Sequence, residues 1–121
     1  MAVILGLFLA FPGARAAEGP MNGTRLLEYC QEAAQENPAN AFRAAYCMAY
    51  VDGTLRGWEA GAYVRDGSPN YCLPPTASLG QLVRVVSKYL TDNPSALPGR
   101  AEILVITAVQ KAYPCGPGKG K

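Results

Sequence analysis

The sequence predicts an all-α protein, a small four-helix domain stapled by two disulfides. Three observations support this prediction. Apolar residues recur at three- and four-residue intervals in four segments separated by proline or glycine. No segment shows the strict apolar–polar alternation of a half-buried strand. The 121-residue chain is one domain in length and contains four cysteines, an even count typical of a disulfide framework.

The first segment has the features of a secretory leader. Residues 2–11 form one apolar run, Pro12 and Gly13 interrupt it, and Ala-Arg-Ala at residues 14–16 fits the small-x-small cleavage rule. The alternative is a buried or membrane-anchoring helix, but the run is short against the roughly 20 apolar residues that a bilayer requires. We expect a signal peptide at residues 1–16, a helical domain at 17–115, a disordered tail at 116–121, and a periplasmic location.

Composition excludes several classes of function. The chain has 11 basic residues, 9 acidic residues and no histidine, and Lys119 and Lys121 lie in the tail. The domain is therefore close to neutral, without the basic run that binding to nucleic-acid phosphates requires. Without histidine no Ser-His-Asp or Cys-His arrangement can form, and the widely spaced cysteines do not fit a metal site. Glu59 and Asp66 could form a carboxylate pair, but such residues are more often solvated, so we expect no catalytic residue, metal or cofactor.

The first two helices are expected on either side of Pro38. Residues before it have helical apolar spacing, with Asn22 or Thr24 as the capping residue. The second helix is expected to begin near Asn40 and to continue to about Val64.

The last two helices form a second pair. Ser78 followed by Gln81 predicts a capping box, and apolar residues follow at helical spacing until Asp-Asn-Pro at residues 92–94. A single turn is expected at residues 95–97, and a final helix at about residues 100–113.

The cysteine positions predict which pairs are bonded. Cys30 and Cys47 lie at similar distances from Pro38, so in two antiparallel helices they stand at similar height. Cys72 precedes the third helix and Cys115 follows the fourth, and these two ends are neighbours in an antiparallel pair. Of the three pairings that four cysteines allow, we expect Cys30 with Cys47 and Cys72 with Cys115.

The second helix carries a continuous stripe of small residues beside a bulky ridge. Each glycine inside a helix costs about 1 kcal/mol relative to alanine, so three in one stripe suggest that something approaches closely. One interpretation is packing against another helix of the same chain. Because polar residues on this helix are few, we also expect it to be central and covered on most sides. The other is a contact surface for a second protomer or a partner, with Tyr50 and Trp58 as anchors. The small residues are Ala41, Ala45, Ala49, Gly53, Gly57 and Gly61.

Six short motifs together give a family resemblance. They are N-G-x-x-L-L-x-x-C from residue 22, C-x-x-Y-V-x-G from residue 47, Y-C-L-P from residue 71, S-x-x-Q-L-V-x-V-V-x-K-Y-L from residue 78, N-P at residue 93 and A-x-x-x-x-Y-P-C from residue 108. In this order and spacing, over about residues 22–115, the chain resembles the Rap/Tai family of type VI secretion immunity proteins. Ala49 and Arg56 depart from the glycine and the acidic residue expected at those positions.

The resemblance implies a function as well as a fold. A protein of this kind is small, helical and periplasmic, and it binds a peptidoglycan-cleaving amidase injected by sibling cells. It blocks the active-site cleft of the amidase without catalysis of its own, and some relatives are homodimers. Two other classes remain open, a periplasmic acid-stress chaperone and an enzyme.

A blocking protein needs a rigid, protruding feature, and residues 63–71 are our candidate. Their glycine and proline content predicts a loop, and Cys72 holds its far end. Tyrosine and arginine are enriched at the energetic centres of interfaces, and a tethered loop loses less entropy on binding. The alternative is an ordinary solvated connection. The candidate contact residues are Tyr63, Arg65, Asp66, Asn70 and Tyr71.

Overall fold

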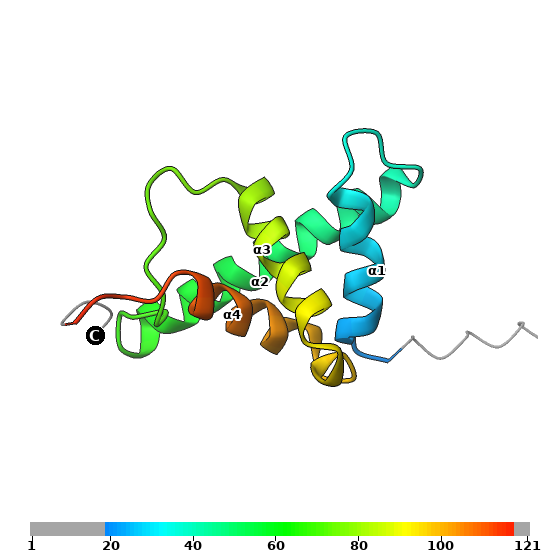
Figure 1. The fold of residues 1–121 in the computed structure, drawn as a ribbon. Helices are drawn as coiled ribbons and strands as arrows, with labels where there is room; N and C mark the ends of the chain where they lie inside the picture. The colour runs from blue at the N-terminus through cyan, green and yellow to red at the C-terminus, as the bar shows by residue number, and fades with distance from the viewer. Residues whose placement is uncertain (1–18, 118–121) are drawn as a thin grey trace, which may run out of the picture.

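The computed structural model describes residues 19–117, which form four α-helices and one short 3₁₀ turn (Figure 1). The elements are α1 (Gly23–Ala33), α2 (Ala41–Arg65), α3 (Leu79–Asp92), η1 (Pro94–Ala96) and α4 (Ala101–Ala112). Within this range no strand forms, although an isolated bridge joins Asn22 to Arg100. The all-α, four-helix prediction is confirmed. The expected leader at 1–16 and the tail residues 118–121 lie outside the described residues.

Side-chain caps fix where three of the helices begin. The Asn22 side chain accepts a hydrogen bond from the backbone N–H of Arg25 at 2.9 Å, and Asn40 caps α2 in the same way. Ser78 and Gln81 form both halves of the predicted capping box. These bonds satisfy N–H groups that have no partner inside the helix.

The first helix is shorter than the sequence predicts. It ends at Ala33 rather than near residue 37, because the chain turns at once towards α2. Glu32 stabilises this turn, since its Oε2 accepts the backbone N–H of Asn40 at 3.3 Å and its carbonyl accepts that of Gln35 at 3.2 Å.

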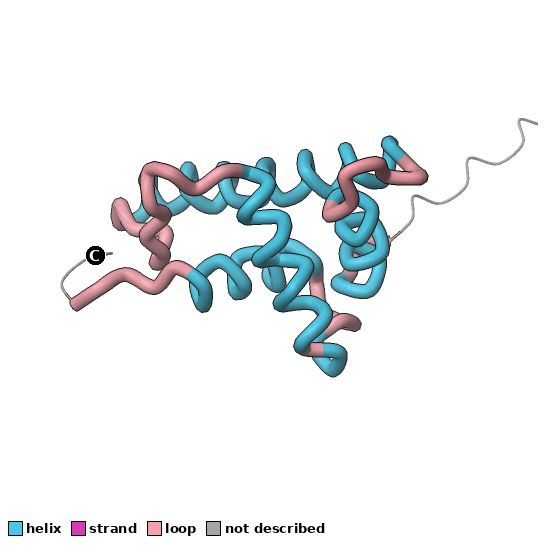
Figure 2. The backbone as a smooth tube through the Cα atoms, turned by 45° about the horizontal axis from the view of Figure 1, so that its top comes forward, coloured by secondary structure: helices cyan, strands magenta, loops and turns pink. Residues whose placement is uncertain are grey.

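Three helices pack on one side of α2. Figure 1 shows α1 beside the first part of α2, α4 beside its second part, and α3 crossing in front. The same arrangement is visible in Figure 2, where the loops lie at the ends of the helices. The fully buried side chains at the centre come from all four helices. The largest are Leu26, Cys30, Cys47, Val51, Val86, Leu90, Val105 and Val109.

Backbone hydrogen bonds tie the start of α1 to the connection between α3 and α4. The N–H of Gly23 donates to the carbonyl of Gly99 at 3.0 Å, and the N–H of Ala101 donates to Met21 at 2.9 Å. A Cβ atom at Gly23 would lie 2.5 Å from Leu104 Cδ1 and 2.9 Å from the carbonyl oxygen of Leu97. Only glycine allows this close approach.

Both predicted disulfides are present. Cys30 bonds to Cys47 inside the core, where both residues are fully buried. Cys72 bonds to Cys115 at the periphery, where Cys72 is exposed. For closed loops of these lengths, chain-entropy arguments assign about 3 and about 4 kcal/mol of stabilisation.

The expectation that α2 is covered on most sides is wrong. Its small-residue stripe faces solvent along its whole length, and a Cβ atom at Gly53, Gly57 or Gly61 would meet nothing within 4 Å. The other helices pack instead on the side that carries Val51 and Leu55, where larger side chains bury more apolar area. The stripe is therefore not a packing surface within the chain.

Candidate interaction surface

Three attachments hold the predicted contact loop on the body of the protein. The indole N–H of Trp58 donates to the carbonyl of Pro69 at 2.8 Å. The Tyr71 hydroxyl donates to Glu59 at 2.7 Å, and the backbone N–H of Cys72 donates to the carbonyl of Tyr113 at 2.9 Å, beside the disulfide. The loop is therefore clamped at its middle and at its far end.

The turn inside the loop has its own hydrogen bonds. The Ser68 N–H donates to Asp66 Oδ1 at 3.0 Å, and the Asn70 N–H donates to Ser68 Oγ at 3.2 Å. The bond from Ser68, followed by the nearby Arg65, lowers the pKa of Asp66. Gly67 and Asn70 have φ angles of 80° and 60°, in the left-handed region that glycine and asparagine tolerate best.

The structure places the five predicted contact residues in different environments. Tyr63 is 84% exposed on the last turn of α2. Arg65, Asp66 and Asn70 are also exposed, and Arg65 both pairs with Asp66 at 3.4 Å and lies over the ring of Trp58. Tyr71, in contrast, is only 4% exposed, so its side chain belongs to the core.

Val64 is a candidate that sequence reasoning missed. Its side chain is 85% exposed, next to Tyr63. Two neighbouring large apolar residues in solvent, followed by Arg65 and Asp66, form a mixed apolar and polar surface at the C-terminal end of α2. The sequence predicts that the helix ends at about Val64. This could have indicated that Val64 is exposed, because residues on the final turn of a helix project beyond the packed body.

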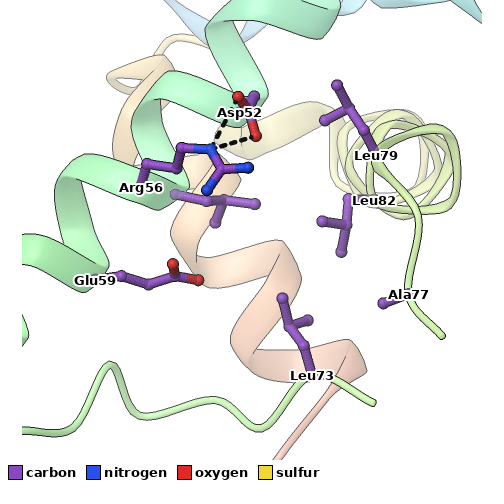
Figure 3. Close-up of a pocket in the computed structure, with 8 residues that line it drawn as sticks. Asp52, Arg56, Glu59, Leu73, Ala77, Leu79 and Leu82 are labelled. Atoms are coloured by element: carbon purple, nitrogen blue, oxygen red, sulfur yellow. Dashed lines mark hydrogen bonds and ion pairs between the residues drawn. The ribbon is translucent and has the colours of Figure 1, made fainter. Parts of the chain in front are cut away.

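A cleft of about 230 Å³ lies beside the loop, between α2, the segment after Cys72, and α3 (Figure 3). One wall carries the polar side chains of α2, and the opposite wall is apolar. Arg56 Nε donates to both carboxylate oxygens of Asp52 at 3.1 Å. The lining residues are Asp52, Leu55, Arg56, Glu59, Leu73, Ala77, Leu79 and Leu82. This cleft could not be predicted from the sequence, because its walls come from separate segments of the chain.

Tyr50 and Trp58, expected as anchors on α2, both contact other parts of the same chain. The Tyr50 hydroxyl donates to Glu102 of α4 at 3.2 Å, and burial, followed by the charge of Glu102, raises the pKa of Tyr50 to about 12. The adjacent face of α2 remains exposed. We call this surface the outer face of α2, consisting of Phe42, Tyr46, Ala49, Gly53, Gly57, Ala60 and Val64.

The reactive groups of this region are engaged in structural bonds. All four cysteines form disulfides, and within residues 19–117 no cluster of side chains could hold a metal ion. Glu59 and Asp66, the candidate carboxylate pair, bind Tyr71 and Ser68 respectively. No helix described here is long and apolar enough to span a bilayer.

A small helical scaffold that holds a clamped loop in solvent is suited to binding another protein. The family model of the Rap1a immunity proteins matches residues 22–115, and the chain belongs to this family. It is accordingly a type VI effector immunity protein, in a family that is typically periplasmic and generally non-enzymatic. Neither the curated proteins nor the solved structures contain a match to the chain.

Proposed function

We propose that this protein is a periplasmic inhibitor that occludes the active-site cleft of a peptidoglycan amidase delivered by type VI secretion. The observation that supports the proposal best is the exposed C-terminal end of α2 together with the clamped loop that follows it, which present aromatic, apolar and charged groups in a fixed conformation. A surface ordered before binding loses little conformational entropy when the complex forms.

The contact region that we propose consists of Tyr63, Val64, Arg65, Asp66 and Asn70. Tyr63 and Val64 supply exposed apolar area, while Arg65 and Asp66 supply charged hydrogen-bonding groups. Tyr71 has a supporting role, because its buried ring and its bond to Glu59 hold the loop against α2.

Binding of the oxidised protein to candidate cell-wall amidases tests this function. We expect tight binding with loss of muropeptide cleavage, and we expect Tyr63→Ala and Arg65→Ala each to weaken binding at least about tenfold, as at interface hot spots. Lys88→Ala is the matched control, because Lys88 is exposed and pairs only with Asp92 on α3.

Two results would contradict different parts of the proposal. Failure to bind any amidase, with binding to another class of effector, would exclude the target. Tight binding to an amidase that neither loop variant weakens would exclude the loop as the contact.

We also propose that the outer face of α2 pairs with a second copy of the chain. Phe42 and Tyr46 lie in the first half of α2, and Gly57 and Ala60 lie in the second half. In an antiparallel pair crossing at Gly53, Tyr46 of one copy lies opposite Ala60 of the other, and Phe42 lies opposite Val64 at each end, so that the same surface serves both copies as an isologous interface requires.

Sedimentation of the wild-type chain and of Gly53→Glu tests this pairing. We expect a wild-type dimer and a monomeric variant with unchanged helical content, because nothing in the chain lies within 4 Å of a Cβ atom at Gly53. A wild-type chain that sediments as a monomer at every concentration contradicts the pairing.

A further inference from the structure

We propose that the cleft between α2 and α3 receives a lysine or arginine side chain of the protein partner, with Glu59 binding the cationic group. The proposal rests on the proposed function only in taking this partner to be the effector. It adds a second site on the immunity protein, beside the loop, and the chemistry that the site selects.

The shape of the cleft suits an aliphatic stem. Leu73, Leu79 and Leu82 form one wall, and the α2 side chains lie opposite them (Figure 3). A volume of about 230 Å³ is ample for one long side chain. Leu73 follows Cys72, whose disulfide and backbone bond to Tyr113 fix this part of the wall. Lysine and arginine place their methylene groups on apolar surface while the charged end finds a polar partner.

The charges around the cleft leave one carboxylate without a cation. Arg56 and Asp52 neutralise each other through the two bonds from Arg56 Nε. Glu59 accepts a bond from the neutral Tyr71 hydroxyl through Oε1, and none of the ion pairs recorded among residues 19–117 includes it. Figure 3 shows the Glu59 carboxylate on the α2 side of the cleft, apart from the Asp52–Arg56 pair.

This charge distribution favours a cation over other occupants. Any group that fills the cleft displaces water from Glu59, and a carboxylate that loses water without gaining a partner is costly. An anionic occupant would add repulsion, and a neutral apolar one would leave the charge uncompensated. A cation on an aliphatic stem does both: its stem covers the leucines, and its charge compensates that of the Glu59 carboxylate.

Small probes test the site without the effector. We would follow the backbone amides of Leu73, Ala77 and Leu79 by NMR while adding n-butylammonium, the side chain of lysine, to the oxidised protein. We expect saturable shifts with a Kd on the order of millimolar. The neutral n-butanol should bind more weakly, by up to about fivefold, in line with the loss of one partly exposed ion pair, and butyrate should produce no saturable shift.

Variants separate the two parts of the site. Glu59→Gln keeps an acceptor for Tyr71, so the fold should persist while the preference for n-butylammonium over n-butanol disappears. Asp92→Asn is the matched control, since it removes one negative charge at the far end of α3. It should leave the preference for n-butylammonium over n-butanol unchanged. Leu73→Ala should weaken the binding of n-butylammonium. It should leave the binding of methylammonium unchanged, because methylammonium has no aliphatic stem.

The outcomes distinguish this site from the proposed function. Equal binding of n-butanol and n-butylammonium, or an unchanged preference in Glu59→Gln, would overturn the cation site even if an amidase binds the protein. Selective binding of n-butylammonium that depends on Glu59 would support the site even if the partner is another class of effector.

Discussion

Two tyrosine–glutamate pairs join α2 to the rest of the molecule. Tyr50 donates to Glu102 on α4, and Tyr71 donates to Glu59 on α2. Burial is the largest cause of the raised pKa of both tyrosines, and the adjacent carboxylate adds to it. Each hydroxyl can donate only while it is protonated, so both links depend on the tyrosine remaining neutral.

These pairs predict a loss of stability at alkaline pH. The contribution of each tyrosine is fully present below the unfolded pKa of about 10. It is lost as the pH rises through the folded value, about 12 for Tyr50 and higher for Tyr71, because the unfolded chain releases its protons first. Denaturant unfolding between about pH 9 and pH 12 should show this decline.

Substitutions assign the decline to these side chains. Tyr50→Phe and Tyr71→Phe should each make the free energy of unfolding depend less on pH in this window. Tyr63→Phe should leave the dependence unchanged, because Tyr63 is 84% exposed. An equal dependence in all three variants would contradict the assignment.

At the scale of the elements, the glycines of the helices differ sharply in what surrounds them. We predict that Gly53→Ala and Gly57→Ala each raise the free energy of unfolding by about 0.5–1 kcal/mol, because alanine is the better helix former and the space is open. Gly23→Ala should lower it by about 1–3 kcal/mol, as in other overpacked sites, because its Cβ would collide with Leu104 and Leu97.

Urea unfolding, at protein concentrations too low for the outer faces of α2 to pair, measures these changes. A loss of stability in Gly53→Ala or Gly57→Ala would contradict the open environment of the outer face of α2. A neutral Gly23→Ala would contradict the close approach of α1 to the α3–α4 connection.

The starts of the helices could be predicted because their signals are local, whereas the end of α1 at Ala33 could not. Asn40, Ser78 and Gln81 form the bonds that their positions predict, and the cysteines pair as the helical hairpins require. Which side of α2 packs against the other helices could not be predicted. Its small stripe and its bulky ridge are both apolar, and spacing identifies a face without saying which one is covered.

The candidate site could be predicted only in part. The loop and its exposed Arg65 follow from composition, but the burial of Tyr71 depends on Glu59 lying within reach from α2. The cleft likewise needs Leu73 and Leu82 to stand opposite α2. These relations arise from tertiary packing, to which single-sequence patterns are insensitive.

At the scale of the whole molecule, the two disulfides differ in their exposure to solvent and in the segments that they join. Cys30–Cys47 joins α1 to α2 in the core, with both residues fully buried. Cys72–Cys115 joins the contact loop to the segment after α4, and Cys72 is exposed. A thiolate must reach a sulfur atom to open a disulfide, so exposure decides which bond is reduced first.

We predict that mild reductant opens Cys72–Cys115 well before Cys30–Cys47. The loop should then lose affinity for the effector while the helical content persists, because the core disulfide stays closed. Timed alkylation with mass spectrometry identifies the reduced pair, and a Cys72→Ser/Cys115→Ser double variant should reproduce the weaker binding. Reduction of both pairs at the same rate would contradict this order.

The bonds between the start of α1 and the α3–α4 connection set an order of events in the folding of the chain. Gly23 finds its partner only when Gly99, far along the sequence, is also present. Packing of α1 on α2, with the Cys30–Cys47 bond, can therefore come first, and the backbone bonds at the start of α1 close only after the α3–α4 connection has formed.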